Sequence, residues 1–134
     1  MPSKVDLEVE LPRATVAPRD ARHALRSWCQ GLIEADLLVD AQLLVSELVA
    51  NAIFHGRGHI TLRARLDEDR LVVEVVDEGS GFERGLRRSD FEQIGGWGLD
   101  IVEEVSSRWG VHEWTTHVWF ELEWSGPRLG EPDR

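Results

Sequence analysis

A stripe of polar residues runs through the segment LLVSELVANAIFHG, whose composition is otherwise that of a buried helix. Glu47, Asn51 and His55 are spaced four residues apart, so on a helix they share one face. Burying a carboxylate beside apolar neighbours is costly unless a partner compensates its charge. The stripe therefore indicates either a bound polar ligand or an ordinary surface helix, and a helix-end histidine such as His55 is more often structural than catalytic.

A second candidate is the loop DEGSGF, which follows the apolar segment LVVEVV. Asp77 is in phase with the alternating apolar residues of that segment, so we expect it to point toward the apolar layer rather than toward water. Gly79 could let the backbone approach a flat ligand closely, and Gly81 could let the chain turn away. The alternative interpretation is that these residues only form a turn.

Glycines recur before the last predicted helix, in the segment GGWGLDIV. Gly95, Gly96 and Gly98 precede a helical pattern that starts at Leu99, and the free backbone N–H groups of a helix N-terminus can bind an anion. The cluster could equally be the end of a flexible loop. Thr116 is in phase with the apolar residues of the last strand, which predicts that its hydroxyl faces the same layer as Asp77 or is an ordinary core hydroxyl.

The surrounding pattern predicts the elements that carry these residues. Apolar and polar residues alternate, as in strands, in KVDLEVELP, ITLRARL, LVVEVVD, RWGVHEW and THVWFELEW. Helical spacing predicts one helix with Pro18 in its first turn, a second over about 37–54, and a short third from Leu99 to Val105. Helices and strands are grouped rather than alternating, so we predict an α+β fold, a two-layer α/β sandwich with a mostly antiparallel mixed sheet and helices on one face.

Helical projection of the second helix separates its faces. The predicted core face of this helix consists of Leu44, Val45, Leu48, Val49 and Ala52. Gln42 and Ser46 lie on the far side, which predicts the solvent face. Glu47 and Asn51 fall between the core face and a second apolar flank. The predicted core face of the sheet consists of Ile60, Leu62, Leu71, Val73, Val75, Val118, Phe120 and Leu122.

Composition and charge restrict the class of protein. The chain has 134 residues, 42% of them hydrophobic, which suits one domain, expected over 1–124 with a disordered tail over 125–134. A net charge of −10 argues against binding nucleic acid or anionic lipid. The single Cys29 excludes an internal disulfide. The N-terminus lacks the apolar region of a signal peptide, and we expect no segment long enough to cross a bilayer, so a cytoplasmic location is predicted.

Taken together and in order, four segments resemble the GHKL superfamily of ATP-binding domains. ELVANAIFHG resembles its N box, VVDEGSGF its adenine-binding aspartate box, GGWGLDIV its second glycine box, and the last strand its threonine-bearing strand. The resemblance covers about 37–124 and implies a Bergerat-type fold. The short length and the ELVxNAxxH form look most like the bacterial anti-sigma-factor serine kinases. That family implies a sigma factor and a small antagonist protein as partners, and a homodimer.

The resemblance implies a role for each candidate residue. Asn51 would ligate Mg²⁺ through its amide oxygen, and Glu47 would orient or deprotonate the serine hydroxyl that attacks ATP. Asp77 would accept a hydrogen bond from the adenine amino group, which guanine cannot donate, so the site should reject GTP. The residues that would complete the nucleotide site are Gly79, Gly81, Gly95, Gly96, Gly98, Leu99 and Thr116.

The sequence departs from the family pattern in its glycine-rich loop and last strand. Trp97 stands where the family often has a small or basic residue, and Thr115 competes with Thr116 for the threonine position. We interpret the three loop arginines as solvated; they are Arg84, Arg87 and Arg88. Besides a kinase, the same motifs fit a nucleotide-responsive binding module with little turnover, or, more remotely, a scaffold that has lost ATP.

A separate feature is the high content of tryptophan, which occurs six times although tyrosine is absent. Trp119 alternates with Phe120 and is therefore predicted on the outer face of the sheet. We predict that a partner or a second copy of the chain binds there, because large apolar residues on a surface often mark interfaces.

Overall fold

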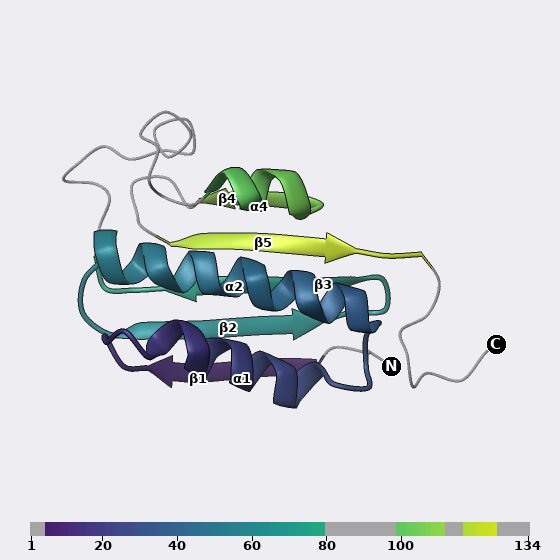
Figure 1. Ribbon diagram of the computed structural model, residues 1–134, viewed down its shortest axis with the longest axis horizontal. Helices are drawn as coiled ribbons and strands as arrows, with labels where there is room; N and C mark the ends of the chain where they lie inside the picture. The colour runs from purple at the N-terminus through teal and green to yellow at the C-terminus, as the bar shows by residue number, and fades with distance from the viewer. Residues whose placement is uncertain (1–4, 80–98, 112–116, 126–134) are drawn as a thin grey trace.

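In the computed structural model, the described residues are 5–79, 99–111 and 117–125. The elements follow one another as β1 (Val5–Leu11), α1 (Ala17–Cys29), α2 (Ala35–His55), β2 (Ile60–Leu66), β3 (Arg70–Val76), α4 (Leu99–Val105), β4 (Arg108–Val111) and β5 (Val118–Glu123). The strands form one sheet in the order β1-β2-β3-β5-β4 (Figure 1). The predicted tail beyond Ser125 lies outside the described residues.

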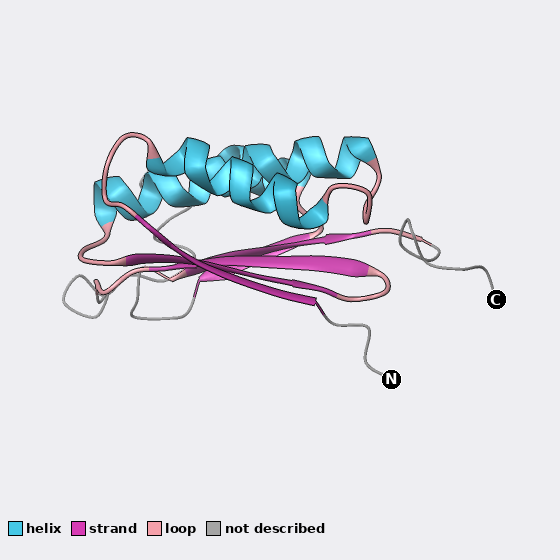
Figure 2. Ribbon diagram, turned by 90° about the horizontal axis from the view of Figure 1, so that it is seen from below, coloured by secondary structure: helices cyan, strands magenta, loops and turns pink. Residues whose placement is uncertain are grey.

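The helices cover one face of this sheet and leave the other face open (Figure 2). The α+β two-layer arrangement is therefore confirmed. We had predicted a mostly antiparallel mixed sheet, and within the described strands every neighbouring pair is antiparallel. The short turn between β2 and β3 requires these two strands to be antiparallel. The strand β1 lies at one edge of the sheet, as its alternating pattern predicts.

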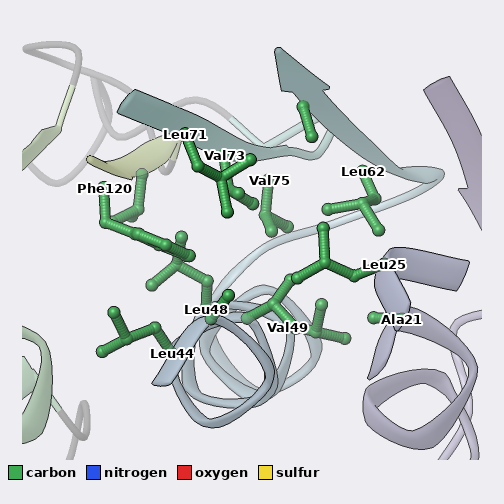
Figure 3. Close-up of a cluster of buried hydrophobic side chains, with 14 of the residues drawn as sticks. Ala21, Leu25, Leu44, Leu48, Val49, Leu62, Leu71, Val73, Val75 and Phe120 are labelled. Carbon is green, nitrogen blue, oxygen red and sulfur yellow. The ribbon is translucent and has the colours of Figure 1, made fainter. Parts of the chain in front are cut away.

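The core lies between the sheet and α2 (Figure 3). Leu44, Leu48 and Val49 of α2 face the apolar side chains of β3 and β5. All eight residues predicted for the core face of the sheet are buried, because the period of a strand places alternate side chains on opposite faces. Fully burying one such aliphatic side chain stabilises the fold by roughly 1.5–3 kcal/mol.

The first helix begins as the sequence predicts, with Pro18 in its first turn. Ala21, Leu25 and Cys29 are spaced four residues apart and are buried against the core. Burial raises the pKa of the Cys29 thiol to about 12, so this cysteine is a core residue rather than a nucleophile at neutral pH.

The second helix corrects one prediction about membranes. Its 21 residues are long and apolar enough, by length and composition, to span a bilayer, with a mean hydropathy of 1.6 over the most apolar window. The expectation that no segment reaches this length is therefore wrong. The apolar side chains are used within the fold, since the predicted core face, from Leu44 to Ala52, is buried. A helix in the core of a folded domain can be as long and as apolar as a membrane-spanning helix.

The side of α2 that we predicted to face solvent instead faces α1. The Arg22 guanidinium donates to the Ser46 hydroxyl at 2.9 Å, and the Gln42 amide donates to the Arg22 carbonyl at 3.2 Å. The exposed face of α2 is apolar: Val39, Leu43 and Phe54 are 62%, 41% and 79% exposed. The prediction was wrong because a helical projection assigns polar residues to solvent. It cannot show that a second helix, here α1, packs against the polar side.

The open face of the sheet carries Trp119 and pairs of oppositely charged side chains from neighbouring strands. Arg63 lies 3.4 Å from Glu8 and 3.5 Å from Glu74, and Glu74 lies 2.7 Å from His117. Trp119 is half-buried on this face, because its ring packs over Gly110 on β4, where a Cβ would lie 2.8 Å from the ring. The predicted placement of Trp119 is therefore confirmed.

Replacing Trp119 by serine tests whether this face binds a partner or a second copy. We expect Trp119→Ser to lower the oligomeric state measured by light scattering, or the affinity for a protein partner, because the large apolar surface is removed. If neither property changes while the variant remains folded by circular dichroism, the open face is not an interface.

Candidate functional site

Two of the predicted site residues lie on α2, one turn apart. Asn51 is 5% exposed, and it is the buried polar residue of the described chain. Among the described residues and atoms, no acceptor lies within hydrogen-bonding distance of its amide nitrogen. Glu47 is half-buried and lies about 6 Å away along the helix axis, four residues at 1.5 Å each. Leaving a buried amide N–H without a partner costs about 1–3 kcal/mol, which is recovered if a ligand with a hydrogen-bond acceptor, such as a phosphate oxygen, binds there.

Asp77 lies directly after β3, beside the C-terminal end of α2. Its Oδ1 accepts hydrogen bonds from the Gly79 N–H at 2.6 Å and from the Arg57 N–H at 3.5 Å. Its Oδ2 is shielded from solvent. A Cβ added to Gly56 would lie 2.2 Å from this Oδ2, so the glycine backbone packs directly on the carboxylate. The predicted inward orientation of Asp77 agrees with these contacts.

The turn between α2 and β2, residues 56–59, is fastened to the segment that contains Asp77. The Glu78 N–H donates to the Arg57 carbonyl at 2.8 Å, and the Glu78 carboxylate accepts from the His59 N–H at 2.9 Å. Gly58 has a φ of 66°, in the left-handed region that favours glycine. These contacts hold the end of α2 and the end of β3 together, so Asp77 lies beside the C-terminus of the helix that carries Asn51.

The contacts of Gly56 with Asp77 and of Gly58 with Glu78 were not predicted from the sequence. A signal was present, because two glycines directly after a helix that carries candidate site residues also allow another backbone or carboxylate to approach closely. The residue that approaches Gly56 could not be identified from the sequence. Gly56 precedes β2 and Asp77 follows β3, so the two come together only because these strands pair.

Substituting Gly56 by alanine is predicted to displace Asp77. The added Cβ would overlap the Asp77 carboxylate and approach the Ala52 carbonyl to 2.8 Å. We expect Gly56→Ala to lower the free energy of unfolding by about 1–3 kcal/mol, as overpacking does, and to weaken nucleotide binding measured by calorimetry.

Gly31→Ala is the control for this substitution. Gly31 has a φ of 84° with no atom near the added Cβ, so its loss should cost stability and leave nucleotide binding unchanged. Equal nucleotide affinity in Gly56→Ala and in the original chain would show that the contact between Gly56 and Asp77 does not affect nucleotide binding.

Several predicted site residues cannot be placed in this site. Leu99 is the first residue of α4, and α4 packs against α2. The other predicted glycines and threonine lie outside the described residues; they are Gly81, Gly95, Gly96, Gly98 and Thr116. So do the loop arginines, Trp97 and Thr115. Within the described ranges, no group of three or more His, Cys, Asp or Glu side chains could hold a metal ion by itself.

Comparison with known families identifies the family of this chain. The family model described as "Histidine kinase-like ATPase domain" matches residues 11–121, which include both α2 and Asp77. The chain belongs to this ATPase family.

Curated relatives of this ATPase domain include an anti-sigma factor and a serine-protein kinase. An anti-sigma F factor of Clostridium acetobutylicum is 44% identical over 48 residues, 33% of this chain and 34% of that protein. A serine-protein kinase RsbW of Listeria innocua is 28% identical over 86 residues, 52% of this chain and 55% of that protein. The matches thus span between about a third and about half of these relatives.

A solved structure supports the fold of the ATPase domain. The crystal structure of the RsbU and RsbW domains of Rv1364c from Mycobacterium tuberculosis superposes with a TM-score of 0.63 and 24% sequence identity. The match covers 97% of this chain and 34% of that chain. At this identity the likeness establishes a shared fold.

The donor set of the site fits a nucleotide with Mg²⁺. The buried amide of Asn51 offers one hard oxygen ligand, and Mg²⁺ characteristically takes few protein ligands together with phosphates and waters. The Asp77 carboxylate, fixed by a backbone N–H, offers a charged acceptor for an amino group.

Proposed function

We propose that this ATPase domain is an ATP-dependent protein serine kinase of the anti-sigma type. It would phosphorylate a small antagonist protein, sequester a sigma factor, or do both, in a cytoplasmic partner-switching circuit and as a homodimer. The observation that carries this proposal is the stripe on α2, where the buried Asn51 amide stands one turn from a half-exposed carboxylate, Glu47. The sigma-factor regulators among its relatives support the choice of circuit.

Each residue of the stripe would contribute a separate part of the reaction. Asn51 would hold Mg²⁺ through its amide oxygen, and the bound ion would supply positive charge for the phosphates of ATP. Glu47 would accept the hydrogen of the attacking serine hydroxyl and orient its oxygen toward the γ-phosphate. Asp77 would accept a hydrogen bond from the adenine amino group and so exclude guanine. The proposed further nucleotide contacts are Gly79, Gly81, Gly95, Gly96, Gly98, Leu99 and Thr116.

The exposed face of α2 supports a protein as the phosphate acceptor. Val39, Leu43 and Phe54 lie on the same side of α2 as Glu47 and expose much of their apolar surface. Apolar patches of this kind mark surfaces that bind other proteins. An acceptor protein seated on this face would bring its serine to Glu47 from the solvent side.

The alternative is a nucleotide-responsive binding module without phosphoryl transfer. Nucleotide binding alone needs Asn51 and Asp77 and does not need a carboxylate at position 47. Glu47 stands one helical turn from Asn51 on α2, and the presence of a carboxylate there favours the enzyme.

Calorimetric titration of the whole chain with ADP, with ATP plus Mg²⁺ and with GTP tests the nucleotide part of the proposal. We expect micromolar binding of both adenine nucleotides and no heat with GTP. If neither adenine nucleotide binds, the nucleotide function is rejected and the domain is a protein-binding module only.

A further inference from the structure

An arginine outside every motif binds the end of α2. Arg13 lies in the connection between β1 and α1, and its guanidinium donates three hydrogen bonds to backbone carbonyls. Nε donates to Gly58 at 2.8 Å, and Nη1 donates to Ala52 at 2.8 Å and to Ile53 at 3.0 Å. The β1–α1 connection, the end of α2 and the end of β3 lie at the same end of the molecule (Figure 1).

Two of the three carbonyls, those of Ala52 and Ile53, belong to the last turn of α2, where a cation is favourable. The last carbonyls of a helix have no partner within the helix and carry the negative end of its dipole. Arg13 donates to the Ile53 carbonyl and gives the Ala52 carbonyl, which also accepts from the Gly56 N–H, a second hydrogen bond. It also reaches past the helix end to Gly58. The planar guanidinium has several donors in a fixed geometry, so it sets the angle between the helix end and the turn that follows.

That turn is also one wall of the adenine-binding site proposed above. Gly56 lies between Ala52, whose carbonyl accepts its N–H at 3.0 Å, and the carboxylate of Asp77. Arg57 donates its N–H to Asp77, and Gly58 packs against Glu78. Arg13 therefore fixes the backbone against which the Asp77 carboxylate rests.

We propose that Arg13 is a positioning residue that sets the orientation of Asp77, and thereby the preference of the site for adenine over guanine. The inference rests on the proposed nucleotide function. Without Arg13 the turn 56–58 can shift, and the Asp77 oxygen no longer stands where it selects an amino group over a carbonyl. Selectivity should therefore fall more than the general affinity for nucleotides.

The experiment measures the affinities of ADP and GDP by competition against a fluorescent (mant) ADP in three whole-chain variants. We expect Arg13→Ala to reduce the ADP:GDP affinity ratio by roughly tenfold, equivalent to about 1.4 kcal/mol. The ratio for Arg13→Lys should lie between that of Arg13→Ala and that of the original chain, since one ammonium cannot span all three carbonyls. Arg26→Ala, which removes an exposed arginine in the last turn of α1, should keep the original ratio.

The ratio separates positioning from stability. If Arg13→Ala lowers the melting temperature and both affinities but keeps the ratio, Arg13 is only structural and the proposal is overturned. If Arg13→Ala does not fold, the ratio in Arg13→Lys decides in the same way. Absence of ADP binding by the original chain would reject the proposed function and this inference with it, whereas binding with an unchanged ratio in the variants rejects the inference alone.

Discussion

Asp77→Asn is expected to abolish measurable binding of ADP and ATP while the fold persists. A charge-assisted hydrogen bond is worth about 1.5–3 kcal/mol, and the asparagine can also present its NH₂ group to the adenine amino group, which leaves two donors facing each other. Together these effects predict a loss of at least about a hundredfold in affinity. Calorimetric titration of the variant with ADP measures it directly.

The structure suggests why this variant should remain folded. The bond from the Gly79 N–H to Asp77 Oδ1 needs only an acceptor oxygen, which an asparagine also has. Asp6→Asn is the matched control, because Asp6 is an exposed carboxylate on the edge strand β1 and should leave ADP binding unchanged. Equal ADP affinity in Asp77→Asn and in the original chain, with both folded, would remove Asp77 from the nucleotide site.

The elements of the fold were predictable from local patterns. The helix α2 starts and ends within two residues of its predicted limits, and β2 coincides with the segment ITLRARL. This succeeds because one face of each element is buried, and burial imposes the period of the element on the sequence. The order of the strands was not predicted, because alternation identifies a strand but does not show which strand pairs with it.

The candidate site was predictable only in part, for a physical reason. Glu47 and Asn51 share a helix, so their relation is local and visible in the spacing. The contacts of Arg13 join residues 39 to 45 positions apart, and no periodicity encodes them. The same limit explains the wrong prediction for Gln42 and Ser46, whose partner, Arg22, lies on another helix.

Glu47→Gln is expected to stop phosphoryl transfer while ADP still binds. Removing a general base typically costs about 10²–10⁴-fold in rate, whereas Glu47 has no role in holding the adenine. The rate is measured as transfer of labelled phosphate from [γ-³²P]ATP to small serine-bearing regulatory proteins, and the affinity by titration with ADP. Glutamine keeps the size and helix propensity of glutamate, so a change in the fold would not account for the loss.

Asp40→Asn provides the control, because Asp40 is a half-buried carboxylate on the same helix, away from Asn51. We expect it to retain transfer. If the original chain transfers phosphate and Glu47→Gln does so at the same rate, Glu47 is not the base. If the original chain binds ATP but transfers phosphate to no acceptor, the α2 stripe would serve a binding module that exposes or hides the Val39, Leu43 and Phe54 surface according to the nucleotide it holds. In that case Glu47→Gln should alter partner affinity rather than a rate, which separates the two functions with one variant.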